Sequence, residues 1–287
     1  MHITIAGKLG SGKSTVSKIL AEKYGFEIYS TGKIQRKIAA ELGISTLEMN
    51  ELMCKDNSYD YKIDNAVAEI SEETTDRSII FDSRMAWHFA KNSFRVFMYV
   101  DPMVAAKRVF NDDRGAVEKY SSIEDANSQL LERSMNENRR FKEIYNVDNF
   151  DYGNYDMVID ASYTSPEYIS ECIYNNFKNH INEICKENII LMSPKSLYPT
   201  KYITEADRST DSEAVGITLY DHYNYVVFNT GAYIESLKNN EVYIRCKNVG
   251  KEVEKIADHL RLEMLEGYES ECGVKFNEIP ETYKRDL

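Results

Sequence analysis

The chain of 287 residues is long enough for about two domains of roughly 150 residues each, and 43% hydrophobic residues suffice for a full core. The formal net charge of −12 excludes partners bound mainly by neutralising phosphates, so neither long nucleic acid nor an anionic membrane surface is expected. No apolar run approaches the ~20 residues that cross a bilayer, and no signal-peptide pattern is present. Five widely spaced cysteines without a C-x-x-C pair favour reduced thiols, so we expect a cytoplasmic protein.

In chain order, the first two thirds alternate strand-like and helix-like segments, which is the pattern of a parallel sheet covered by helices. The predicted strands span 1–6, 26–30, 78–81, 94–100 and 155–159. The predicted helices span 13–24, 32–43, 46–54, 61–75, a segment opened by Pro102, 123–145 and 166–186. Residues 1–186 are therefore expected to form a three-layer α/β domain.

The pattern changes at about Glu187. Short strands are predicted at 189–192, 216–220, 223–228 and 241–246, with Asp221 and His222 as a possible turn, and a helix is predicted over 251–265. Residues 187–287 are thus expected to form a small α+β domain. Its tyrosines either make a recognition surface or lie half-buried in the strands; they are Tyr220, Tyr223, Tyr225 and Tyr233.

Residues 7–14 match the phosphate-binding pattern G-x-x-x-x-G-K-[ST], between an apolar strand and an amphipathic helix. Glycines allow successive backbone N–H groups to surround phosphate oxygens, and the helix that follows directs its positive end at the anion. Lys13 is expected to reach the β- and γ-phosphates of ATP, and the Ser14 hydroxyl to bind Mg²⁺. The predicted ATP-binding residues of this loop are Gly7, Lys8, Leu9, Gly10, Ser11, Gly12, Lys13, Ser14 and Thr15.

Asp82 ends the apolar segment 78–81, as expected of a carboxylate beside a phosphate-binding loop. It is predicted to hold Mg²⁺ directly or through water. The alternative is an aspartate that only caps the segment that follows.

Arginines are expected to hold a second phosphate. Thr31 can cap a helix after the second strand, Arg36 lies one turn further on, and Arg84 follows Asp82 by two residues. Guanidinium groups near the carboxyl ends of neighbouring strands suit bidentate phosphate capture, although solvated surface arginines are the alternative.

Further basic residues follow between 105 and 142, among them Arg108, Arg114, Arg133 and Arg140. Arg133 and Arg140 are seven residues apart and project from one helix face, where they could neutralise a transferred phosphoryl group. Acidic residues are about as frequent in this stretch, so a salt-bridged helix surface is the alternative.

Several segments of the chain together resemble the cytidylate kinase-like branch of the nucleoside monophosphate kinases. They are the phosphate loop, STGKIQR, DSRMAWHF at 82–89, and ERSMNENRRFKEIYNVD followed by NYDMVIDAS. The resemblance covers about residues 1–177. It implies a P-loop kinase fold with a parallel five-stranded sheet, a monophosphate-binding helical insert after the second strand and an arginine-bearing lid. Ser83 stands where the family commonly has glycine, and Phe141 where it has tyrosine.

By this resemblance, Arg36 and Arg84 grip the acceptor phosphate, and Arg108, Arg114, Arg133 and Arg140 belong to the lid. The predicted catalytic residues are Lys13, Asp82, Arg84, Arg133 and Arg140. Asp60 and Asp64 lie one turn apart on the insert, where they could bind the exocyclic amino group of a base or form a solvated helix face.

The expected activity is transfer of the γ-phosphoryl group of ATP, with Mg²⁺, to a nucleoside monophosphate, first of all CMP or dCMP. One alternative is a P-loop kinase of another small hydroxyl-bearing metabolite, with Asp82 as base. Another is a nucleotide-sensing protein whose C-terminal domain binds a partner. Residues 193–200 and the tyrosine-rich strands resemble the start of ParB-like domains, but the arginine and histidine that those domains place after the second strand are absent, so no nuclease or NTP hydrolysis is inferred.

Overall fold

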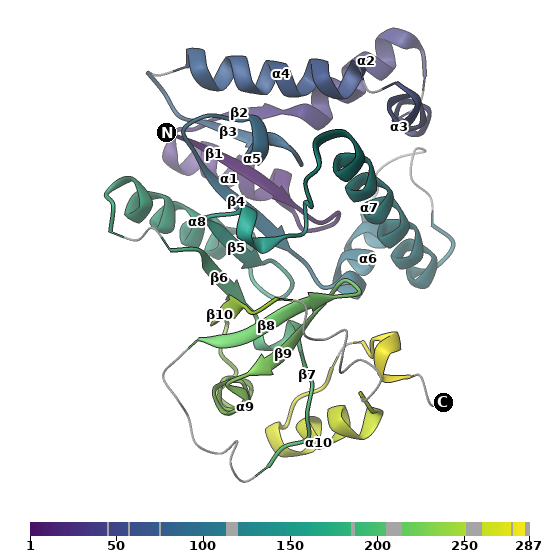
Figure 1. Ribbon diagram of the computed structural model, residues 1–287, viewed down its shortest axis with the longest axis vertical. Helices are drawn as coiled ribbons and strands as arrows, with labels where there is room; N and C mark the ends of the chain where they lie inside the picture. The colour runs from purple at the N-terminus through teal and green to yellow at the C-terminus, as the bar shows by residue number, and fades with distance from the viewer. Residues whose placement is uncertain are drawn as a thin grey trace.

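The computed structural model describes residues 1–44, 46–56, 58–74, 76–112, 120–184, 187–204, 214–250, 260–276 and 278–284. One sheet of ten strands runs through the molecule in the order β2-β3-β1-β4-β5-β6-β10-β8-β9-β7 (Figure 1). The strands are β1 (His2–Gly7), β2 (Glu27–Ser30), β3 (Ile79–Asp82), β4 (Ser93–Tyr99), β5 (Met157–Asp160), β6 (Ile189–Met192), β7 (Leu197–Pro199), β8 (Val215–Tyr220), β9 (Tyr223–Phe228) and β10 (Ile244–Asn248).

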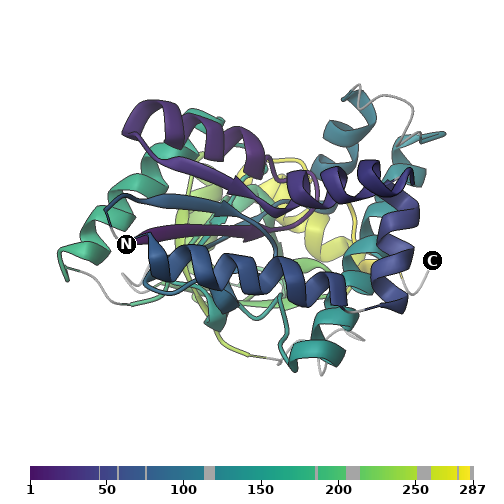
Figure 2. The ribbon, with the colours of Figure 1, turned by 90° about the horizontal axis from the view of Figure 1, so that it is seen from above.

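The first five strands pair in parallel in the order β2-β3-β1-β4-β5, which confirms the predicted α/β fold class. Successive side chains point to opposite faces of such a sheet. In β3, Ile80 packs on one face, and Ile79 and Phe81 pack on the other. Figure 2 shows the consequence: α1 (Lys13–Tyr24) and α4 (Ser58–Glu73) lie on opposite sides of the strands.

The remaining helices are α2 (Thr31–Leu42), α3 (Thr46–Lys55), α5 (Ala86–Phe89), α6 (Pro102–Asn111), α7 (Ile123–Tyr145), α8 (Pro166–Ile181), α9 (Thr230–Lys238) and α10 (Leu262–Cys272). Side-chain caps mark the first turns of α6 and α7. Asp101 caps α6 through Oδ1, which accepts from the backbone N–H groups of Met103 and Val104, and Ser122 caps α7. None of the helices in the described ranges is long and apolar enough to cross a membrane.

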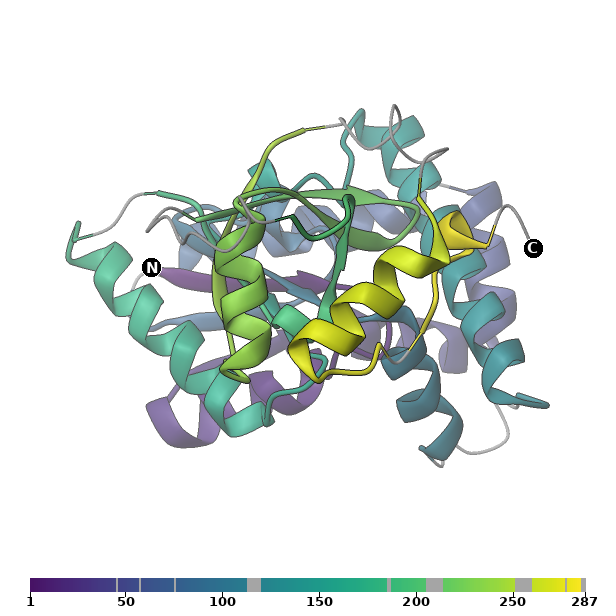
Figure 3. The same ribbon diagram turned by 90° about the horizontal axis from the view of Figure 1, so that it is seen from below.

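The sheet does not end at β5, and is therefore larger than the five strands expected. β6 pairs in parallel with β5, β10 pairs antiparallel with β6, and β8, β9 and β7 complete the sheet. One hydrophobic cluster unites Phe97 and Val158 of the first part with Ile217, Tyr233 and Tyr268 of the second. Figure 3 shows α9 and α10 side by side at the end of the molecule away from α4. Division of the chain into domains at residue 186 stays a prediction.

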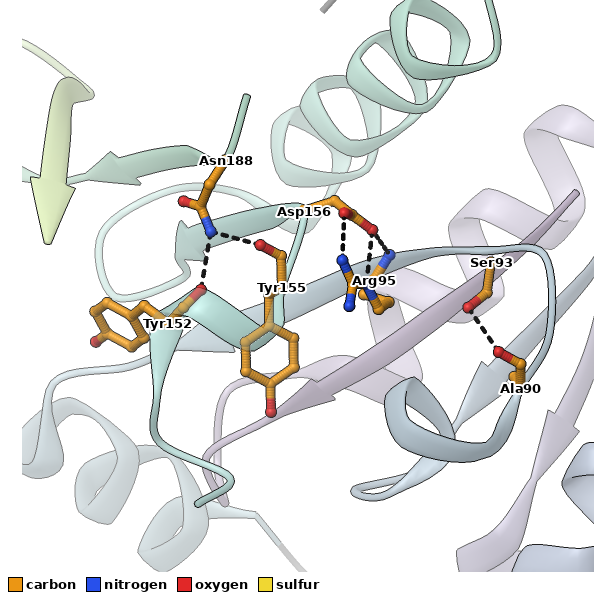
Figure 4. A network of polar contacts seen from close by, with 7 residues as sticks. All are labelled: Ala90, Ser93, Arg95, Tyr152, Tyr155, Asp156 and Asn188. Carbon is orange, nitrogen blue, oxygen red and sulfur yellow. Dashed lines mark hydrogen bonds and ion pairs between the residues drawn. The ribbon is translucent and has the colours of Figure 1, made fainter. Parts of the chain in front are cut away.

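Polar contacts tie the edge of the first part to the start of the second (Figure 4). Arg95 of β4 donates from Nε and Nη2 to the two carboxylate oxygens of Asp156, at 3.0 and 2.7 Å. Asn188, just before β6, donates from Nδ2 to the carbonyls of Tyr152 and Tyr155, at 2.8 and 2.5 Å. The start of β6 is therefore held against the segment that leads into β5.

Several predicted elements differ from those in the structure. The helix expected to reach residue 186 ends at Ile181, where Asn182 is the C-cap. The helix expected over 251–265 falls largely outside the described residues; Leu260 and Arg261 are not helical, and α10 begins at Leu262. Helices α5 and α9 and strand β7 were not predicted. Helix α5 and strand β7 are too short to show a periodic pattern.

The tyrosines of the second part pack inside it. Tyr223, Tyr225 and Tyr233 are buried, and Tyr220 is partly exposed. Burial of these rings favours a packing role over a recognition surface. Cys172, Cys246 and Cys272 are free thiols.

Candidate active site

The loop between β1 and α1 has the conformation of a phosphate-binding loop. Gly10 and Gly12 have φ of 76° and 83°, a left-handed region that favours glycine. A Cβ on Gly10 would lie 2.9 Å from the Cβ of Ala105 in α6, so this position also lacks room for a side chain. The N-terminus of α1 follows directly, with Gly12 as its N-cap, and its backbone N–H groups provide the positive end that an anion requires.

Lys13 lies folded over the loop. Its Nζ donates to the carbonyl oxygens of Gly7 and Lys8, at 2.9 and 2.8 Å. Burial, together with the neighbouring charge of Arg84, lowers the pKa of Lys13 to about 8, and the charge of Asp82 opposes this shift. A phosphate at the loop would offer this amine stronger, charged acceptors than the two carbonyls.

Ser14 and Asp82 lie together at the carboxyl ends of β1 and β3. The Ser14 hydroxyl donates to Asp82 Oδ2 at 2.9 Å, so the two oxygens are near enough to bind one ion. A hydroxyl and a carboxylate are hard oxygen donors, and Mg²⁺ needs few protein ligands when phosphates supply the others. The residues present therefore fit Mg²⁺.

Three arginines line the same site as Lys13. Arg84 and Arg133 both pair with Oε1 of Glu137, Arg133 through Nε at 3.1 Å. Arg140 pairs through Nη2 with Asp60 Oδ1 at 3.3 Å, and both side chains are almost fully buried. Arg84 and Arg133 keep 26% and 32% of their side-chain surface exposed, and a carboxylate of the protein pairs with each of the three arginines. The pair of Arg133 with Glu137, four residues on in α7, is the salt bridge along a helix that the sequence analysis gave as the alternative.

Asp60 and Asp64 are buried on the inner face of α4 rather than on a solvated face. Within the described part of the chain, Asp60 Oδ2 has no hydrogen-bond partner. Asp64 Oδ2 accepts from the hydroxyl of Tyr145 at 2.6 Å. Burial raises the pKa of Asp64 to about 6; the bond from Tyr145 opposes this shift, and the charge of Asp60 adds to it.

This raised pKa predicts a stability effect. Because the folded-state pKa of Asp64 lies above its ordinary value of 3.8, the folded protein favours the neutral carboxyl, and the associated stability is lost as pH rises through about 6. Asp64→Asn removes this loss and keeps an acceptor for Tyr145. We expect the variant to be more stable than wild type by about 1–3 kcal/mol at pH 8, and by less at pH 5. Urea unfolding at the two pH values measures the difference, and an equal effect at both would contradict it.

The predicted residues surround one cavity of about 190 Å³. It is bounded by the phosphate loop, the start of α2, α4, the end of β3 and the inner face of α7. Those of its lining residues that the sequence analysis singled out are Lys13, Ser14, Thr31, Asp60, Asp64, Asp82, Arg84, Arg133 and Arg140.

The other predicted residues lie elsewhere or are not described. Arg108 donates from Nη1 to the carbonyl of Gly10 at 3.4 Å and from Nη2 to that of Ala161 at 2.7 Å, so it lies beside the loop but outside the cavity. Thr15 is exposed in the first turn of α1. Arg36 belongs to α2, but its side chain lies outside the described part of the chain, as does the whole of Arg114.

Two residues of the site escaped the sequence analysis. Glu137 joins Arg84 to Arg133, and Tyr145 binds Asp64. Glu137 lies four residues after Arg133, a spacing that places the two side chains together on a helix and could have indicated the pair. No sequence signal links Tyr145 to Asp64, because the two belong to different helices.

The chain is similar in sequence to known cytidylate kinases. The model of the cytidylate kinase-like family matches residues 2–163. The cytidylate kinase of Thermoplasma volcanium is 31% identical over 193 residues, which are 66% of this chain and 95% of that protein. The cytidylate kinase of Methanosarcina barkeri is 36% identical over 164 residues, 56% of this chain and 87% of that protein. Among solved structures, shikimate kinase from Bacteroides thetaiotaomicron aligns with a TM-score of 0.43 and 15% identity over 63% of this chain and 98% of that one.

Proposed function

The chain belongs to the cytidylate kinase-like family, and from this we propose that it transfers the γ-phosphoryl group of ATP to the phosphate of a nucleoside monophosphate, with CMP or dCMP as the preferred acceptor. One observation carries the proposal. The side chains of Lys13, Arg84, Arg133 and Arg140 line a single cavity, Lys13 from the start of α1, Arg84 from the end of β3, and the other two from α7. Two anionic groups that meet end to end need cations placed in this way.

The donor phosphates would bind at the loop. There the backbone amides would donate to phosphate oxygens. Lys13 would exchange its hydrogen bonds to the loop carbonyls for bonds to phosphate oxygens. A phosphate oxygen of the acceptor is the nucleophile, so no side chain has to attack or form a covalent intermediate. Mg²⁺, held by Ser14 and Asp82, would neutralise charge on the donor phosphates when bound.

The acceptor phosphate would replace Glu137 next to Arg84 and Arg133. In the structure Glu137 Oε1 is shared by both guanidinium groups, at the place where a phosphate oxygen could accept from both. The cavity of about 190 Å³ is smaller than the ~300–1,000 Å³ of most small-molecule sites, and release of this ion pair would enlarge it. Arg36 stays a predicted ligand of the same phosphate.

The base of the acceptor would lie against α4. Asp60 Oδ2 is buried beside the cavity and has no donor among the residues that the structure describes, and a buried carboxylate oxygen without a donor is costly. The exocyclic amino group of cytosine is a donor that would satisfy this oxygen. This supports CMP or dCMP over uridine monophosphate, which presents a carbonyl at the corresponding position.

A panel of acceptors tests the proposal. With ATP and Mg²⁺, we expect CMP or dCMP to give the highest kcat/KM for acceptor-dependent ADP release, by about tenfold or more over UMP, because one buried hydrogen bond to a charged group is worth roughly 1.5–3 kcal/mol. The panel should include the other ribo- and deoxyribonucleoside monophosphates, and small hydroxyl-bearing metabolites such as shikimate. Turnover with a hydroxyl acceptor alone would indicate a different P-loop kinase, and ATP binding without turnover would indicate a nucleotide sensor.

A further inference from the structure

The side chain of Lys8, the second residue of the phosphate loop, points away from the cavity and into the C-terminal part of the chain. It is buried, and its Nζ donates to the carbonyl oxygen of His222 at 2.6 Å. His222 belongs to the two-residue turn that joins β8 to β9. The two residues are 214 positions apart, and the family match ends at residue 163, well before the turn.

We propose that Lys8 is a positioning residue through which the β8–β9 turn holds the phosphate loop in its ATP-binding conformation. The inference rests on the proposed binding of ATP at this loop and adds a role for the C-terminal part of the chain. Lys8 does not need to touch ATP in order to act in this way.

The backbone of Lys8 shows why its position matters for the loop. Its N–H donates to the carbonyl of Met98 in β4 at 3.1 Å. Its carbonyl accepts from Ser11 Oγ and from Lys13 Nζ, both at 2.8 Å. Rotation of the peptide at Lys8 would therefore displace the carbonyl to which Ser11 and Lys13 donate. Lys13 is the lysine expected to bind the transferred phosphate.

The turn that receives Lys8 is itself firmly placed. Asp221 and His222 have φ of 44° and 71°, the left-handed geometry of a tight hairpin turn. Asn224 accepts through Oδ1 from the hydroxyl of Tyr152 at 3.2 Å, and Tyr223 donates from its hydroxyl to Glu278 Oε1 at 2.7 Å. The ring of His222 meets that of Phe150 edge to face, with centroids 6.2 Å apart. These contacts fix the carbonyl that Lys8 needs.

Opposing contributions act on the charge of the Lys8 amine. Its Nζ lies 4.2 Å from the centroid of the Tyr99 ring, a cation–π distance. Burial lowers the pKa of Lys8 to about 7, and the charges of Asp101, Asp160 and Glu278 oppose this shift. Glu278 comes from the C-terminal part, so both parts of the chain contribute charges to this lysine.

The experiment measures the Kd of ATP, with Mg²⁺ and without acceptor, by calorimetric titration of the full chain. We expect Lys8→Met to raise this Kd about tenfold, since the lost hydrogen bond to a charged donor is worth roughly 1.5–3 kcal/mol. Lys8→Arg should recover most of the affinity. Lys238→Met removes a lysine of α9 that pairs with Glu271 on the surface, and it serves as the matched control with an unchanged Kd.

A substitution in the β8–β9 turn tests the role of His222 as the partner of Lys8. His222→Val places a β-branched residue where φ is 71°, which should displace the carbonyl and also raise the Kd of ATP. If Lys8 acts through His222, the double variant should bind ATP no more weakly than the weaker single variant. In steady-state kinetics the KM for ATP should rise, while the KM for the acceptor stays within twofold.

The outcomes are distinct. An unchanged Kd in Lys8→Met, or additive effects in the double variant, would overturn the inference. Thermal unfolding of each variant shows whether the fold is kept. If Lys8→Met does not fold, the Kd of ATP is compared in the single variants Lys8→Arg, which should keep most of the affinity, and His222→Val, which should lose affinity. Because ATP binding is measured without acceptor, failure of wild type to phosphorylate any monophosphate would refute the proposed function and leave this result intact.

Discussion

Replacement of Lys13 by alanine is expected to lower kcat/KM by about a thousandfold or more. Lys13 is the amine of the phosphate loop, and its Nζ lies between the loop carbonyls and the cavity that Arg84 enters. Its charge would be most important when negative charge shifts between donor and acceptor, so kcat should fall more than ATP affinity. Steady-state rates of ADP release, with the acceptor at saturation, measure the loss.

A surface lysine of the same helix provides the control. Lys18 of α1 pairs with Glu22 at 3.7 Å and is largely exposed, so Lys18→Ala should keep wild-type rates. Lys13→Arg keeps the positive charge and changes its position, so it tests whether the charge alone is sufficient for activity. The longer guanidinium cannot occupy the same place below the phosphates, and we expect it to recover little activity. Near-normal turnover in Lys13→Ala would remove the loop from the mechanism.

Arg84→Ala is expected to raise the KM of the acceptor and lower kcat, together by about a hundredfold or more in kcat/KM, while the Kd of ATP stays within threefold. Arg84 follows β3, lines the cavity together with Lys13, and pairs through its guanidinium with Glu137. Removal of the arginine also leaves Glu137 with less positive charge beside it, which should oppose binding of an acceptor phosphate.

Two variants separate this role from a general loss of charge. Arg139→Ala removes a neighbouring arginine of α7 that is exposed and donates to Asn136, so it should keep wild-type kinetics. Glu137→Gln keeps the shape and removes the charge that competes with a phosphate, so it should not reproduce the defect of Arg84→Ala in acceptor KM. If Arg84→Ala weakened ATP and acceptor equally, the arginine would belong to the donor side of the site.

Part of this protein could be predicted from its sequence because the determining interactions are local. The pattern Gly7–Ser14 defines a strand, a tight loop and a helix, since glycine backbone conformations and a helix N-terminus arise within a few residues. Helices α1 and α7 have the predicted bounds for the same reason: a short local signal starts each one, and an apolar stripe continues it. Asp82 could be predicted for the same reason, because it directly follows an apolar segment in the sequence.

The tertiary structure alone decided which charges face each other and what covers the loop. The burial of Asp60 and Asp64, the position of Glu137 between two arginines and the contact of Lys8 with His222 all join distant segments. No local pattern specifies such pairs, because they depend on the order in which strands join a sheet and on which helix face lies over it. The continuation of the sheet from β5 into β6 is of this kind: hydrogen bonds between parallel strands are set by packing of the intervening helix, and not by the sequence of either strand.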